Sequence, residues 1–225
     1  VRYYGVFFGP AVSHLSSQQQ DGTPLSIRNF LAFSHAISPD TQLGASVSWN
    51  WRPVQGQDWS LRDPFVKISK PSAWQSGNWN WYTDLRLHLP VTERSRSRDL
   101  WAALQSFNSL DYDGEIGGFG LYSAVRHNFL GAQGSGDEWE FYAAPHLHWQ
   151  ALKTLSAGVL LEWNGGTPFE NATESRVIYS DGWNLQPGLS WDASPGLNVS
   201  PFLNLPLSPG SDANLGMTLS WKIGT

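Results

Sequence analysis

Cysteine is absent from the 225 residues of this chain. Its absence excludes a disulfide framework and any metal site built on thiolates. Charged residues are also scarce, since they make up 15% of the sequence against about 25% in soluble domains. The net charge of −5 comes without a basic stripe, so we expect no nucleic-acid partner.

Long hydrophobic runs are missing as well. No segment approaches the roughly 18 uninterrupted apolar residues that indicate a membrane-spanning helix. Aromatic residues, in contrast, reach 14% of the chain and include 13 tryptophans. The arrangement of these apolar side chains along the sequence therefore has to explain how they are used.

Polar and apolar residues alternate in several segments, which is the period of a β-strand. Between residues 43 and 52 the odd positions are mostly large and apolar, while the even positions are polar or small. A similar split recurs in 79–89 and 155–163, and it runs through 215–223 without a break. Each segment thus has one apolar and one polar face.

These patterns predict an all-β fold of one domain over residues 1–225, an antiparallel up-and-down barrel of about twelve strands. The strands are expected at 3–14, 25–36, 42–52, 62–70, 79–90, 99–111, 115–130, 138–151, 154–164, 175–192, 197–206 and 214–223. The weakest assignments are 62–70 and 99–111, and the latter can also be read as an amphipathic helix. Ten strands plus a helix are therefore the alternative.

The connections alternate in length. Short turns are expected at 38–41, 153–154 and 194–196, and longer polar stretches lie between them along the chain. A membrane barrel has short periplasmic turns and longer outer loops, so both chain ends are expected on the periplasmic side. The stretch Lys70 to Asn78 is longer than this scheme requires.

A soluble sandwich also alternates, so the apolar face could point to a core or to lipid. Two features favour lipid: the strands match the 9 to 11 residues of a tilted membrane strand, and aromatic residues gather toward strand ends, where they suit the headgroup level. The predicted aromatic girdle, or alternatively a subunit or lipid interface, consists of Trp49, Trp51, Trp79, Trp81, Trp139, Trp149, Trp163, Trp183, Trp191 and Trp221.

The polar faces carry charges that suit a wet lumen. The predicted lumen charge network consists of Arg28, Arg52, Lys67, Asp84, Arg86, Arg126, Glu140, Glu162, Asp192 and Lys222. Opposite charges in a narrow barrel pair, so we expect a network that fills the interior. The functional alternative is a constriction that selects solutes.

The chain resembles the outer-membrane β-barrel class, through its alternating strands and its final segment Leu215-Gly-Met-Thr-Leu-Ser-Trp-Lys-Ile-Gly. The resemblance implies a multi-pass protein of the Gram-negative outer membrane that contacts its lipid and is inserted by the barrel-assembly machinery. Barrels of this class usually finish on an aromatic residue, whereas this chain finishes on Thr225. Either Trp221 takes that role or residues are missing.

A weaker resemblance is to small barrels of predatory bacteria that assemble into rings around trapped lipid. The segments Asp63-Pro-Phe-Val-Lys-Ile-Ser and Asp84-Leu-Arg-Leu-His-Leu-Pro carry it. It implies a homo-oligomer with a lipid-organising role.

Candidate chemistry on the polar faces is limited. His146 and His148 lie two apart on one face together with Glu140, but the sequence specifies no third metal ligand. Asp84 and His88 also share a face, but any neighbouring strand could supply a serine, so this constellation is not specific. We expect no enzyme activity, no metal and no cofactor.

The sequence thus favours a homo-oligomeric outer-membrane barrel with a structural or lipid-organising role and a charged, largely filled lumen. One alternative is a porin or channel for small solutes. Others are a lipid-modifying outer-membrane enzyme and a soluble sandwich that stacks tryptophans on sugar rings.

Overall fold

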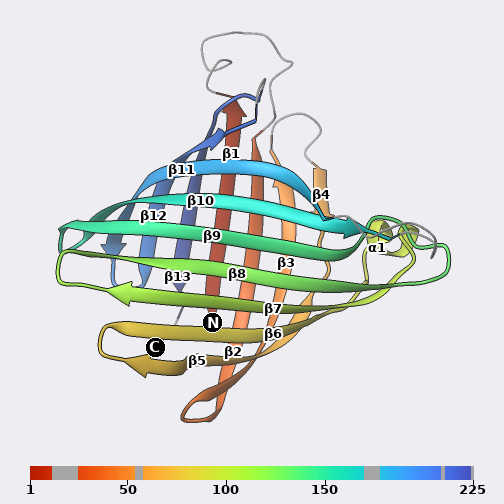
Figure 1. Cartoon of the computed structure of the whole chain (residues 1–225), viewed down its shortest axis with the longest axis horizontal. Helices are drawn as coiled ribbons and strands as arrows, with labels where there is room; N and C mark the ends of the chain where they lie inside the picture. The colour runs from red at the N-terminus through yellow and green to blue at the C-terminus, as the bar shows by residue number, and fades with distance from the viewer. Residues whose placement is uncertain (12–24, 54–57, 170–177, 209–210, 224–225) are drawn as a thin grey trace.

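A computed structural model describes residues 1–11, 25–53, 58–169, 178–208 and 211–223. These residues form thirteen strand segments and one short helix (Figure 1). The strands are β1 (Arg2–Ala11), β2 (Ser26–Ser38), β3 (Thr41–Arg52), β4 (Asp58–Leu61), β5 (Phe65–Ser76), β6 (Trp79–His88), β7 (Leu100–Asp113), β8 (Gly117–Leu130), β9 (Asp137–Leu152), β10 (Leu155–Pro168), β11 (Tyr179–Ser194), β12 (Leu197–Pro206) and β13 (Asn214–Lys222). The helix is α1 (Glu93–Ser97). No helix among the described residues has the length and hydropathy needed to cross a bilayer.

The strands close into one antiparallel barrel. Each strand pairs with its sequence neighbours from β5 to β13, β13 pairs with β1, and the β1–β2 and β2–β3 pairings complete the circle. Segments β4 and β5 pair with successive parts of β3, so together they occupy one position in the wall. The predicted barrel of about twelve strands is therefore confirmed, and closure leaves no unpaired edge in lipid.

Five short turns lie at one end of the barrel. The turns β2–β3, β5–β6, β7–β8, β9–β10 and β11–β12 have two or three residues, and β1 begins and β13 ends at this same end. Gly77 and Gly196 adopt positive φ values in two of these turns, a conformation that glycine adopts without steric cost. We call this the short-turn end and the opposite one the long-loop end.

Strand alternation separates an outer and an inner face. In β3 the odd residues Leu43 and Val47 are exposed on the outside, whereas the even residues Ser46 and Ser48 are buried. The same alternation extends around the wall, so many large apolar side chains are exposed on the outside. An apolar belt of this size is stable only against an apolar medium, because water would make its exposure costly.

The structure decides the two weakest sequence assignments. The strand predicted at 99–111 is confirmed, because β7 spans Leu100–Asp113 and pairs with both β6 and β8, so the alternative of a helix there is wrong. The expected strand 62–70 is replaced by β4 and by β5, which continues to Ser76. The long connection expected after Lys70 is therefore a two-residue turn.

Pro71 explains why the end of β5 was missed. Proline lacks the backbone N–H that strand pairing uses and often marks the end of a strand or a bulge. In the structure the β5–β6 register shifts between Lys70 and Trp74, so the proline falls in a bulge. The Nδ2 atom of Asn80 donates to the Pro71 carbonyl oxygen at 3.3 Å.

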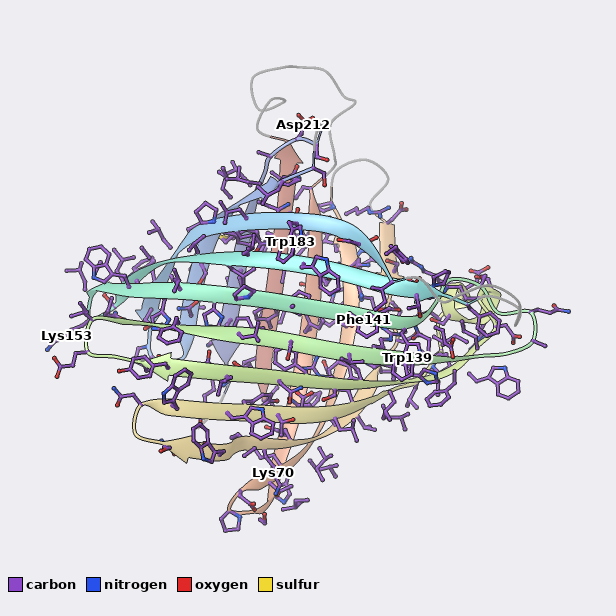
Figure 2. All side chains as sticks on the ribbon, viewed as in Figure 1. Lys70, Trp139, Phe141, Lys153, Trp183 and Asp212 are labelled. Atoms are coloured by element: carbon purple, nitrogen blue, oxygen red, sulfur yellow. The ribbon has the colours of Figure 1, made fainter. Side chains whose placement is uncertain are left out.

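The predicted tryptophans lie toward the two ends of the wall. On their strands, Trp49, Trp51, Trp139, Trp163 and Trp183 occupy the half nearer the long-loop end, and Trp79, Trp81, Trp149, Trp191 and Trp221 the half nearer the short-turn end. Figure 2 labels Trp139 and Trp183, together with Lys153 in a turn at the opposite end. Two separated aromatic belts are the arrangement found at the two interfaces of a bilayer. Trp59, which was not among the predicted girdle residues, stacks on Trp51 with 5.4 Å between the ring centroids.

Four expected features lie wholly or partly outside the described residues. The long stretch Ser16 to Pro24 lies wholly outside them, and the end of the strand 3–14, the start of the strand 175–192 and the stretch Thr167 to Glu174 lie partly outside.

Candidate functional site: the barrel lumen

The lumen holds two cavities. The first, of about 500 Å³, is lined near the long-loop end of the barrel, and we call it the outer chamber. The second, of about 670 Å³, extends toward the short-turn end, and we call it the inner chamber. Both are lined by Phe107, Tyr142 and Glu162, so they adjoin at these residues. The lumen therefore contains more open volume than the largely filled interior predicted from the sequence.

Four arginines from four parts of the wall line the outer chamber. They are Arg28 from β2, Arg62 from the link between β4 and β5, Arg86 from β6 and Arg126 from β8. The acidic residues in the same lining are Asp63, Glu140 and Glu162. Which arginines remain available to a solute depends on how these acids are bound.

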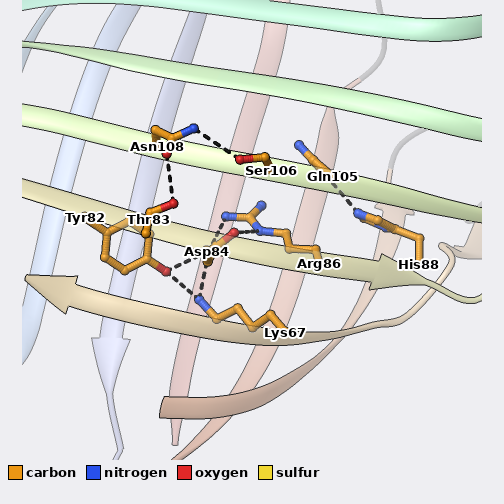
Figure 3. A network of polar contacts seen from close by, with 9 residues as sticks. All are labelled: Lys67, Tyr82, Thr83, Asp84, Arg86, His88, Gln105, Ser106 and Asn108. Carbon is orange, nitrogen blue, oxygen red and sulfur yellow. Dashed lines mark hydrogen bonds and ion pairs between the residues drawn. The ribbon is translucent and has the colours of Figure 1, made fainter. Parts of the chain in front are cut away.

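Arg86 belongs to a compact buried group around Asp84 (Figure 3). The Asp84 carboxylate accepts from Arg86 Nε at 2.7 Å and from Arg86 Nη2 at 2.9 Å, and Lys67 Nζ lies 3.3 Å away. The Tyr82 hydroxyl donates to the same carboxylate at 2.7 Å. The Asp84 side chain is fully shielded from solvent. One buried carboxylate thus faces two cations.

Arg126 has looser partners. Its Nε donates to Asn128 Oδ1 at 2.9 Å, and its Nη1 lies 3.9 Å from Glu140 Oε2. The Nδ2 of Asn128 donates to Glu140 Oε1 at 2.7 Å and so fixes that carboxylate. A third lumen acid, Glu162, accepts from Gln186 Nε2 at 3.0 Å.

Arg28 and Arg62 have no such partner. In the part of the chain that the structure describes, no carboxylate lies within ion-pair distance of either guanidinium, and the buried Arg28 Nε forms no hydrogen bond. Glu162 acts on Arg28 only through space. Arg62 in turn lies in the field of three other arginines, Arg28, Arg94 and Arg126. The outer chamber therefore carries uncompensated positive charge.

Asp63 forms no ion pair with these arginines, because its oxygens are used to anchor the loop before α1, and its charge acts on Arg62 only through space. Its Oδ1 accepts from the backbone N–H groups of Val91 and Thr92 at 3.0 Å each, and its Oδ2 accepts from the Ser95 hydroxyl. Thr92 also caps α1 by accepting from the Ser95 backbone N–H at 3.3 Å. These contacts hold the loop against the wall at the long-loop end.

Six aromatic rings line the inner chamber, together with aliphatic and polar side chains. The rings belong to Tyr4, Phe8, Phe107, Tyr122, Tyr142 and Phe202. Phe107 and Tyr122 stack with a centroid distance of 6.2 Å, and Phe8 and Phe202 meet edge to face at 6.3 Å. Aromatic pairs in these arrangements stabilise each other beyond their area of contact.

Glycines on the inner face make room for these rings. Gly216 lies between Phe8 and Phe202 across three paired strands, and an added Cβ there would overlap the Phe202 ring. Gly158 and Gly188 pair with each other further along the wall and line the chamber without side chains. Bare backbone at these positions leaves the volume of the inner chamber open.

At the short-turn end, two histidines pair with two aspartates across β8. His146 Nε2 lies 3.0 Å from Asp111 Oδ1, and His148 Nε2 lies 3.3 Å from Asp113 Oδ1. The strand between them contributes glycine at both crossings, Gly120 and Gly118. The possible metal pair His146 and His148 is thus held by carboxylates, and no group of three or more possible metal ligands occurs among the described residues.

Replacing Gly120 with valine is expected to separate His146 from Asp111 and to lower the free energy of unfolding by about 1 to 3 kcal/mol. A Cβ there would overlap the Asp111 carboxylate and lie 2.6 Å from the Leu110 carbonyl oxygen and 2.7 Å from His146 Cε1. Urea unfolding of the refolded protein measures the change. The control is Gly9→Ala, whose Cβ meets only the Leu215 carbonyl oxygen closely, at 3.3 Å. Equal stability of both variants would contradict the close crossing.

The residues of the predicted charge network form these separate local groups, and three of them do not lie in the lumen. Arg52, Asp192 and Lys222 lie at strand ends and are exposed. Arg62 was not predicted as a lumen residue. Even-numbered residues point inward in β4 but odd-numbered ones do so in β5, because the regular alternation is interrupted at 62–64. The candidate pair Asp84 and His88 is not in contact, since His88 Nε2 lies 2.9 Å from Gln105 Oε1 and Asp84 binds Arg86.

Solved structures with the same architecture are porins and channels. The KdgM porin in complex with disordered oligogalacturonate matches with a TM-score of 0.60 and 10% identity, covering 100% of both chains. The COG4313 outer membrane channel from Pseudomonas putida F1 matches with a TM-score of 0.64 and 10% identity, covering 98% of this chain and 94% of that one. The fold is that of an outer-membrane porin or channel.

A further match extends the same likeness. The NanC porin covers 99% of both chains with a TM-score of 0.54 and 11% identity. No protein-family model matches the sequence, and no curated protein matches it in a sequence search. The outer-membrane β-barrel expected from the alternating strands is thus confirmed at the level of fold, and none of these three structures is described as an enzyme.

Proposed function

We propose that this protein is a passive outer-membrane channel for small anionic solutes. The observation that carries the proposal is the pair of lumen guanidiniums, Arg28 and Arg62, which have no carboxylate within ion-pair distance in the described residues. Arg126 adds to the same field with a loosely held partner. A lumen lined by one sign of charge concentrates ions of the opposite sign and repels like ions.

The geometry supports a channel more than the structural role that the sequence favoured. A lumen packed with paired charges would leave little volume, whereas this one contains two adjoining chambers. The matched structures are porins and channels, and one of them is a complex with oligogalacturonate, which is an anion. Both observations favour permeation by an anion.

The proposal is tested by solute flux into proteoliposomes. We expect a small carboxylate such as lactate to enter faster than an ammonium compound of similar size, because only the anion is attracted to Arg28 and Arg62. The double variant Arg28→Gln/Arg62→Gln is expected to reduce this preference by about tenfold or less, in the range of a modest field effect on rate. Arg52→Gln, at an exposed strand end, is the control that should leave the preference unchanged.

Equal entry of the two solutes in the unmodified protein would contradict an anion channel. If neither solute enters, the channel is contradicted and the structural role predicted from the sequence is favoured.

Homo-oligomerisation and contact with outer-membrane lipid stay predictions of the sequence. The outward face of β6 and β7 offers one place for a subunit contact, because it carries polar side chains among apolar ones. The Thr83 hydroxyl donates to Asn108 Oδ1 at 2.8 Å, and Asn108 Nδ2 donates to Ser106 Oγ at 3.2 Å (Figure 3). Polar side chains of this kind are common where membrane segments meet.

A further inference from the structure

We infer that the solute for which this lumen is built is a carboxylate that carries a flat ring, such as an aromatic acid. The inference rests on the proposed channel function and deepens it by naming the solute class. Its basis is that the outer chamber, in which Arg28 and Arg62 have no ion pair among the described residues, adjoins an inner chamber that six aromatic rings help to line. A simple inorganic anion would not be stabilised by the aromatic side chains of the inner chamber, because contact with apolar groups does not replace its hydration.

The two kinds of wall meet at the same depth of the barrel. The Arg28 guanidinium lies 5.9 Å from the centroid of the Phe8 ring, which lines the inner chamber. Three positions round the wall, on β6, the Arg86 guanidinium lies 4.8 Å from the Phe107 ring, which lines both chambers. A ligand whose carboxylate contacts Arg28 therefore has its ring directed toward aromatic side chains. This spacing suits a short molecule with its charge attached directly to the ring.

The inner chamber has the size and the surfaces for a ring. Its volume of about 670 Å³ falls within the range of small-molecule sites. Gly158 and Gly188 give bare backbone on one side, and the side chains of Phe107 and Tyr122 line another. Polar groups of the same lining, including Gln186 and Ser190, leave hydrogen-bond partners for ring substituents.

One lumen acid, Glu162, opposes the binding of an anion, so its removal should tighten that binding. Glu162 lines both chambers and acts electrostatically on Arg28. Its carboxylate repels a bound carboxylate in proportion to their proximity. The Glu162→Gln variant removes that repulsion while keeping an amide oxygen that can accept from Gln186. It is therefore expected to bind the ring-bearing anion more tightly than the unmodified protein does.

The experiment titrates the chloride current of the full chain in planar bilayers with benzoate and, separately, with acetate. The inference predicts that benzoate reduces the current at a concentration about three- to tenfold lower than acetate, the gain that one or two aromatic contacts supply. The variant Phe8→Leu/Phe202→Leu is expected to remove that difference. Phe33→Leu, on the exposed outer face, is the matched control.

The outcomes separate this inference from the channel function. A chloride-preferring current on which benzoate and acetate act equally, or on which Phe8→Leu/Phe202→Leu has no effect, would overturn the ring-bearing solute and keep the anion channel. If no current is found, the channel fails, and calorimetry of benzoate and acetate binding to the detergent-solubilised protein decides the ring preference by itself. Tighter benzoate binding there, strengthened by Glu162→Gln, would support the site, and equal binding would overturn it.

Discussion

Replacing Asp84 with asparagine is expected to lower the free energy of unfolding by about 3 to 5 kcal/mol, the range for breaking a buried ion pair. The change leaves Lys67 and Arg86 as two cations around a neutral side chain that is shielded from solvent. Neither cation can move fully into water, because their side chains are only 23% and 21% exposed. Urea unfolding in detergent, followed by the heat-dependent gel shift of the folded barrel, measures the loss.

Two controls test whether the loss of stability comes from leaving buried charges without a partner. The Asp40–Lys70 pair has a similar separation of 3.5 Å but is 61% and 51% exposed, so Asp40→Asn should lower the free energy of unfolding far less than Asp84→Asn does. The triple variant Lys67→Met/Asp84→Leu/Arg86→Met removes all three charges together and should recover most of the lost stability. If Asp84→Asn unfolds like the Asp40 variant, the Asp84 group is not the buried centre described above.

Leu161→Arg is expected to destabilise the folded barrel in a bilayer by about 2 to 4 kcal/mol, the cost of arginine near the membrane midplane. Leu161 lies halfway along β10 and pairs with Leu185 on the outward face. An outward guanidinium at that depth has neither water nor a carboxylate within reach. The fraction of folded protein in lipid vesicles over a urea series measures the effect.

Its neighbour supplies the matched control. Leu160 lines the inner chamber, so Leu160→Arg places the same charge in the lumen, where water and Glu162 are available. We expect the lumen variant to be the more stable of the two. The reverse order would mean that the two faces of β10 have been assigned the wrong way round.

The facing of most strands could be predicted from the sequence because strand alternation is a local property. Trp79 and Trp81 share the outward face, and Asp84 and Arg86 share the inward face, whatever strand lies beside them. Local pattern failed where the backbone leaves the regular pleat. The break at 62–64 changes the facing between β4 and β5 and brings Arg62 into the lumen, and the bulge beyond Lys70 hides the end of β5.

The partners of the lumen charges could not be predicted, because they depend on strand register and on distances across the barrel. Asp84 pairs with Lys67 from the neighbouring strand, whereas Arg28 has no carboxylate within ion-pair distance among the described residues, although the sequence contains more acids than bases. The chambers were unpredictable for the same reason. Gly216 and Phe202 belong to neighbouring strands, and only their pairing shows that the glycine makes room for the ring.

The most direct test of the proposed function is the zero-current potential of the purified protein in a planar bilayer that separates concentrated from dilute potassium chloride. An anion channel lets chloride run down its gradient ahead of potassium, so we predict that the dilute side becomes negative. The potential should shrink in Arg28→Gln/Arg62→Gln. A dilute side that becomes positive, or a membrane that passes no current, would contradict the account of this lumen as a path for anions.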